Sequence, residues 1–129
     1  MKPTTAATVP FQVLSDLHLE VGQQYFSFDF PTTAPNLILA GDIGALSNYE
    51  AYLDLLHNQT ERYDRVFLVL GNHEFYGLDF ATAISTAKML EKEPCLGGKL
   101  LFLQQARVDL PNAITVRYMS RRPISLRWN

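Results

Sequence analysis

Three short apolar blocks in the first two thirds of the chain each end abruptly in a polar turn. They occupy residues 11–14, 37–40 and 66–70. Each block is too short for a buried helix and carries bulky or β-branched side chains that favour strands. The pattern therefore predicts three buried β-strands, each followed by polar residues at its carboxyl end.

Helical periodicity follows the second block. Apolar side chains recur at helical intervals from about Tyr49 to Gln59. Ser47 stands three residues before Glu50, which is the spacing of a capping box at a helix start. We therefore expect an amphipathic helix that crosses back over the sheet.

A second helix is predicted after the third block, because Asp79 can cap its first turn. Its expected buried stripe consists of Phe80, Ala83, Ile84, Ala87 and Leu90. Further short strands are predicted at residues 100–103, 107–110 and 113–116. Strands that alternate with helices are typical of right-handed crossovers in a parallel sheet, so the predicted fold class is α/β.

Candidate ligands follow all three of the first strands. Asp16 and His18 follow the first strand, Asp42 the second, and Asn72 and His73 the third. Because the carboxyl ends of neighbouring parallel strands meet at one edge of a sheet, we expect these side chains to converge. In extended backbone Asp16 and His18 would project together, as half of a divalent metal site. Each motif alone also fits a hydrogen-bonded loop, whereas the three together favour a shared site.

Composition is that of a single globular domain of 129 residues, with 47% hydrophobic and 19% charged residues. The formal net charge of -2 provides no basic field, so composition does not favour nucleic acid as a partner. Cys95 is the one cysteine and fits a reducing compartment. No apolar run approaches the ~20 residues of a membrane span, so we expect a cytoplasmic protein.

The three polar turns carry motifs that resemble a known family. DLH at residues 16–18, GDIG at 41–44 and GNHE at 71–74 are similar, in this order, to the first three motifs of the calcineurin-like metallophosphoesterases. The resemblance implies a sandwich of two sheets flanked by helices. Residues 11–116 would supply its first βαβαβ half, a partial metallophosphoesterase sandwich.

The resemblance also implies a two-metal site that hydrolyses phosphate mono- or diesters. Asp16 and His18 would bind the first divalent ion, Asp42 would bridge both ions, and Asn72 would bind the second. His73 would lie beside the scissile phosphate as a proton or hydrogen-bond donor. The implied ions are manganese, iron, zinc or magnesium, and the mixed donor set does not choose among them.

The chain departs from the family pattern in two places. Many members carry an aspartate three residues after the bridging one, which orients the motif histidine. Ala45 stands there in this chain, so we expect His73 to use another partner, such as Asp16. The family also takes metal ligands from histidines in its carboxyl-terminal half, and no histidine follows His73. The second ion is therefore expected to be held poorly.

These departures predict an incomplete domain. We expect a disordered arm at residues 1–10, an incomplete phosphoesterase domain at 11–116, and a basic tail outside the fold at 117–129. A truncated product or a misread frame would explain such an ending. The domain would then expose an apolar sheet face through which the chain could associate with another.

Two functions follow from these expectations. The first is a metal-dependent phosphoesterase that is weakly active or inactive alone. The alternative is a non-catalytic remnant or association module that binds one divalent cation weakly. A receiver-like domain phosphorylated on Asp42 is disfavoured, because it would explain neither His18 nor the pair of Asn72 and His73.

Overall fold

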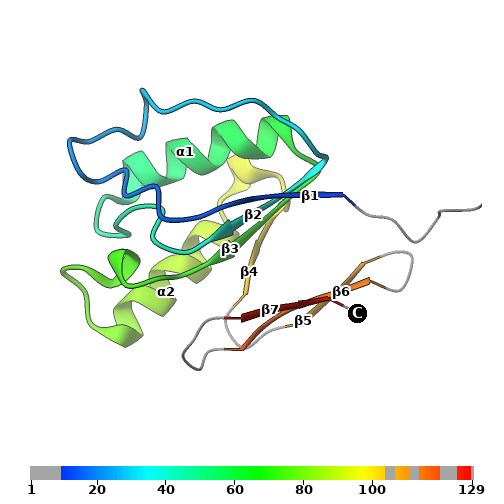
Figure 1. Cartoon of the computed structure of the whole chain (residues 1–129). Coiled ribbons are helices and arrows are strands. Elements are labelled where there is room, and N and C mark those ends of the chain that lie inside the picture. Colours follow the sequence, from blue (N-terminus) through cyan, green and yellow to red (C-terminus); the bar gives the residue numbers. More distant parts are fainter. Residues whose placement is uncertain (1–9, 104–106, 111–113, 120–124, 129) are drawn as a thin grey trace, which may run out of the picture.

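A parallel sheet of four strands forms the centre of the molecule (Figure 1). The computed structural model describes residues 10–103, 107–110, 114–119 and 125–128. In spatial order the strands are β1 (Phe11–Leu14), β2 (Asn36–Ala40), β3 (Arg65–Val69) and β4 (Leu100–Phe102), and every neighbouring pair is parallel. The predicted α/β class is confirmed, and the carboxyl ends of β1, β2 and β3 lie at one edge.

Two helices cover one face of this sheet. Helix α1 (Tyr49–Arg62) follows β2, and α2 (Phe80–Glu91) follows β3. Alternate side chains of the two central strands pack with both helices in one core cluster, which includes Leu37, Leu39, Val66, Leu68, Tyr52, Leu56, Ala83, Ala87 and Leu90. Both crossovers therefore place their helices on the same side, as successive right-handed connections require.

The opposite face of the sheet is also buried at its centre. Ile38, Phe67 and Val69 point away from the helices, and each is fully buried. Val13, on the edge strand, is 51% exposed. The expectation of an uncovered apolar face is therefore wrong for the three central side chains, because the chain itself covers them.

The helix starts differ from each other. Asp79 caps α2 as predicted, and its side chain accepts a hydrogen bond from the Thr82 backbone N–H at 2.7 Å. The predicted capping box of Ser47 and Glu50 does not form. Asn48 is the N-cap of α1, and its Oδ1 instead accepts a hydrogen bond from the Tyr25 hydroxyl at 2.9 Å. The start of α1 is thus held by a hydrogen bond from Tyr25, and no side chain of its own caps the helix.

Phe80 is the exception in the predicted buried stripe of α2. Ala83, Ala87 and Leu90 are buried and Ile84 is half-buried against the core, whereas Phe80 is 63% exposed. It stands at the first position of the helix, and its ring stacks on that of Phe75. The stripe therefore begins one turn later than the sequence pattern suggests.

A second, antiparallel sheet follows the first in the chain. It consists of β5 (Arg107–Leu110), β6 (Ile114–Met119) and β7 (Ser125–Trp128), in this order. Strand β6 runs past the expected domain boundary at residue 116, and β7 lies wholly within the expected tail. Residues 1–9 of the predicted arm lie outside the described residues, and the division into arm, domain and tail stays a prediction.

Two short 3₁₀ turns complete the described elements, η1 (His73–Phe75) and η2 (Pro94–Leu96). The first of them lies directly after β3 and carries part of the predicted site. Within the described part of the chain, neither α1 nor α2 has the length and apolar character that a membrane span requires.

Candidate metal centre

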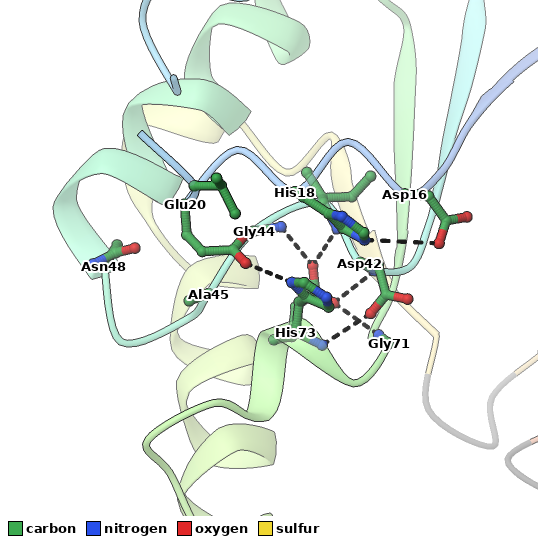
Figure 2. A network of polar contacts seen from close by, with 12 residues as sticks. Asp16, His18, Glu20, Asp42, Gly44, Ala45, Asn48, Gly71 and His73 are labelled. Atoms are coloured by element: carbon green, nitrogen blue, oxygen red, sulfur yellow. Dashed lines mark hydrogen bonds and ion pairs between the residues drawn. The ribbon is translucent and has the colours of Figure 1, made fainter. Parts of the chain in front are cut away.

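Three of the predicted ligands converge where β1 and β2 end. Asp16, His18 and Asp42 each offer one ligand atom, and these atoms all lie within 4.8 Å of one another. The His18 Nε2 is 3.9 Å from the Asp16 Oδ1. Figure 2 shows the three side chains gathered at the tips of two neighbouring loops. The predicted convergence is confirmed for these residues.

The backbone reaches this arrangement by a route that the sequence pattern did not predict. Asp16, His18 and Asp42 have φ angles of 58°, 49° and 56°, which is the left-handed region and not extended strand. Backbone hydrogen bonds hold the two loops together, since Asp16 N–H donates to Gly41 O and His18 N–H to Asp42 O, both at 3.0 Å. The prediction that Asp16 and His18 project from extended backbone is therefore wrong, although their side chains do meet.

The third loop lies directly against Asp42. The His73 backbone N–H donates to the Asp42 Oδ1 at 2.9 Å. A Cβ atom on Gly71 would lie 2.5 Å from the same oxygen and 2.6 Å from the Asp42 nitrogen, so only glycine fits there. Asp42 follows β2, and its carboxylate is thus oriented by the backbone of the loop that follows β3.

Glu74 is a buried carboxylate that joins the second and third loops, and sequence reasoning gave it no role. It is fully buried, and its two oxygens accept five hydrogen bonds of 2.8 to 3.1 Å. The donors are the backbone N–H groups of Asp42, Ile43, Gly44 and Gly71 and the hydroxyl of Tyr52. Burial raises the pKa of the Glu74 carboxyl, while these hydrogen bonds oppose the increase. The one sequence feature that could have indicated this role is the position of Glu74, a charged residue directly after the candidate ligands Asn72 and His73.

His73 lies beside the cluster and takes a partner other than the one predicted. Its Nδ1 is 2.5 Å from the Oε2 of Glu20, whereas Asp16 is paired with His18. The imidazole of His73 stacks on that of His18, with centroids 3.9 Å apart and an angle of 4° between the planes. The hydrogen bond with Glu20 raises the pKa of His73. Figure 2 shows Glu20 and Asp16 on opposite sides of the two stacked rings.

Asn72 occupies the turn between Gly71 and His73. It is the N-cap of η1, and its side chain is exposed. Its role as a ligand of a second ion stays a prediction.

Comparison with known proteins decides the family. A family model described as calcineurin-like phosphoesterase matches residues 9–109, which is most of the chain and includes all three loops. The chain belongs to the calcineurin-like phosphoesterase family. No curated protein and no solved structure matches the chain.

The donor set of this phosphoesterase fits the divalent metal on which the family depends. Two carboxylates and an imidazole are hard or borderline ligands, and manganese, iron, zinc and magnesium all accept such donors. The side chains of Asp16 and His18 are 66% and 41% exposed, so an ion and a phosphoester could reach them from solvent. The described residues therefore provide a possible metal site that opens outward.

Proposed function

We propose that this phosphoesterase centre hydrolyses phosphate mono- or diesters with divalent cations. The observation that carries the proposal is the meeting of Asp16, His18 and Asp42, whose ligand atoms lie within 4.8 Å of one another at the edge where His73 also lies. Family membership supports a phosphoester as the substrate. Asp16 and His18 would hold a first ion, Asp42 would be shared with a second, and Asn72 would bind the second.

The chain's own residues would position the metal ligands and supply a proton to the leaving group. Bound divalent cations would neutralise charge on the phosphoryl oxygens and lower the pKa of a water nucleophile. Asp42 is held in place by the backbone N–H of His73. The imidazole of His73, whose pKa is raised by Glu20, keeps its proton to higher pH and can donate it to the leaving oxygen.

We further propose that the chain alone is weakly active or inactive. The first ion would have three protein ligands, and no histidine follows His73 to supply more. Fewer protein ligands weaken the retention of a metal ion, and the second ion suffers most. We also propose a cytoplasmic location, which the single cysteine, Cys95, fits. Manganese serves as the test ion.

The alternative function is a non-catalytic module that binds a single cation. It is favoured by the same donor set, because Asp16, His18 and Asp42 form one three-ligand cluster, which suits one ion. The two functions share the metal and differ in turnover.

Turnover of p-nitrophenyl phosphate and its bis ester with Mn²⁺ separates the two functions. The purified chain is compared with Asp42→Asn and with Asp54→Asn, a matched change on the exposed side of α1. Turnover that is lost in Asp42→Asn and kept in Asp54→Asn supports the enzyme. Mn²⁺ binding without turnover supports the non-catalytic module, and turnover that survives in Asp42→Asn contradicts the proposed site.

A further inference from the structure

The side chain of Glu20 contacts the imidazole of His73. The Oε2 of Glu20 lies 2.5 Å from the Nδ1 of His73, and the two side chains are only 15% and 18% exposed. The other oxygen, Oε1, is buried and has no hydrogen-bond partner among the described residues. Within that part of the chain, the imidazole is therefore the one hydrogen-bond donor to this carboxylate.

The role of Glu20 differs from that of Glu74, which stands on the third loop, after β3. Glu74 accepts backbone N–H groups from two loops and thereby holds the chain in place. Among the described residues, no backbone N–H donates to the side chain of Glu20. Removal of the Glu20 carboxylate should consequently leave the backbone hydrogen bonds between the loops intact. It should change mainly the protonation and orientation of the His73 ring.

The contact determines which nitrogen of His73 carries a proton. An ionised carboxylate can only accept, so Nδ1 must donate to Glu20. Nε2 is then unprotonated in the neutral ring, and in the imidazolium it carries the proton that can be transferred. Stacking on His18 and the contact with Tyr76, whose ring centroid is 4.5 Å away, restrict rotation of the ring. Glu20 therefore selects both a tautomer and a ring orientation.

We propose that Glu20 is a positioning residue that fixes the tautomer and orientation of His73 for phosphoester hydrolysis. It does so from the first loop, whereas position 45 on the second loop offers only the methyl group of Ala45. The inference rests on the proposed function for its catalytic consequence. The geometric part can be tested without metal or substrate.

The first experiment is NMR on the full chain with ¹⁵N-labelled histidine and no metal. The wild type, Glu20→Gln and Glu20→Ala are compared, and His73→Gln assigns the resonances. We expect a hydrogen-bonded Nδ1–H in the wild type that is lost in Glu20→Ala, with a shift toward the other tautomer. Glu61→Gln is the matched control, because Glu61 pairs with His57 on α1 at 3.3 Å and lies outside the site. His73 resonances that are the same in Glu20→Ala and wild type overturn the proposal.

The second experiment measures turnover of bis(p-nitrophenyl) phosphate with Mn²⁺. We expect Glu20→Ala to lower kcat by about 10- to 100-fold, as is usual for residues that orient a functional histidine, with KM and Mn²⁺ affinity unchanged. An altered NMR spectrum with unchanged kcat overturns the positioning role and leaves the proposed function intact. If the wild type binds Mn²⁺ but shows no turnover, the non-catalytic module is supported, and the NMR comparison alone decides whether Glu20 sets the state of His73.

Discussion

Asp16, His18 and Asp42 hold backbone conformations that cost free energy. They are three of the four described non-glycine residues with positive φ. A left-handed residue other than glycine costs roughly 1–2 kcal/mol, and such strain tends to collect at functional sites. Here it is offset by hydrogen bonds that join the loop after β1 to the loop after β2. The strain turns three side chains toward a common point that a regular strand end would not provide.

Gly71 is the residue whose change should test this arrangement most directly. In Gly71→Ala the new Cβ would lie 2.5 Å from the Asp42 Oδ1, so the carboxylate or the loop must move. Overpacking of this kind costs about 1–3 kcal/mol of unfolding free energy. We expect reduced stability in urea denaturation together with weaker Mn²⁺ binding in calorimetry.

Gly77→Ala serves as the control for that change. Apart from its two chain neighbours, no described residue has an atom within 4 Å of a Cβ placed there, and only the positive φ of 78° opposes the substitution. It should lower stability and leave Mn²⁺ affinity unchanged. Equal loss of Mn²⁺ affinity in both variants would show that the contact between Gly71 and Asp42 does not shape the site.

The loops after β2 and β3 act as one unit because Glu74 binds both. Its carboxylate spans the backbone of Asp42, Ile43 and Gly44 on one side and Gly71 on the other. Tyr52 extends the connection to α1 through its hydroxyl. The sheet edge, the helix and both loops therefore share one buried acceptor, and the placement of Asp42 depends on it.

Glu74→Gln removes half of this acceptor without changing its size. Whichever way the amide turns, its NH₂ group faces at least two backbone N–H donors that the carboxylate oxygen had accepted. Each buried donor left without a partner costs about 1–3 kcal/mol, so two such donors predict a loss of about 2–6 kcal/mol in the free energy of unfolding. Urea denaturation at constant m-value measures the loss.

Glu61→Gln is the matched exposed change for this experiment and should alter stability by less than about 0.5 kcal/mol. If Glu74→Gln is as stable as Glu61→Gln, the buried carboxylate does not hold the loops together. In that case another interaction must fix the position of Asp42.

At the scale of the whole molecule, the apolar pattern predicted most of the parallel sheet. β1 was predicted with its observed bounds, and the next two strands to within one residue at each end, because apolar blocks between glycine turns leave few alternatives. Convergence of the loop tips followed from topology alone, since carboxyl ends of parallel strands share an edge. These parts of the fold depend on local patterns and on general rules of chain connection.

The parts that were not predicted depend on contacts between distant residues. The pairing of Glu20 with His73 spans 53 positions, and no periodicity marks it. The five donors around Glu74 come from three segments, so a charged residue in a motif looked like another surface group. Burial of Phe67 on the face away from the helices likewise depends on distant contacts, such as that with the Phe11 ring, whose centroid is 5.8 Å away. Three-dimensional packing, and not local pattern, decided each of these.

Metal binding should stabilise the whole chain, because only the folded state brings the ligands of two loops together. Asp16 and Asp42 carry like charges on exposed or half-exposed side chains, and a cation between them relieves their repulsion. A ligand that binds only the folded state at ten times its Kd adds about 1.4 kcal/mol to the unfolding free energy. We expect Mn²⁺ to raise the Tm of the wild type and EDTA to reverse the increase.

Asp42→Asn should abolish most of this Mn²⁺-dependent increase, and Asp54→Asn should keep all of it. The comparison is decisive for the site because a cation that binds exposed acidic groups elsewhere would stabilise both variants equally. An equal increase in the two would therefore mean that Asp16, His18 and Asp42 do not form the metal site. An increase confined to chains with Asp42 would show that the two loops bind the ion jointly, even if the chain turned over no substrate.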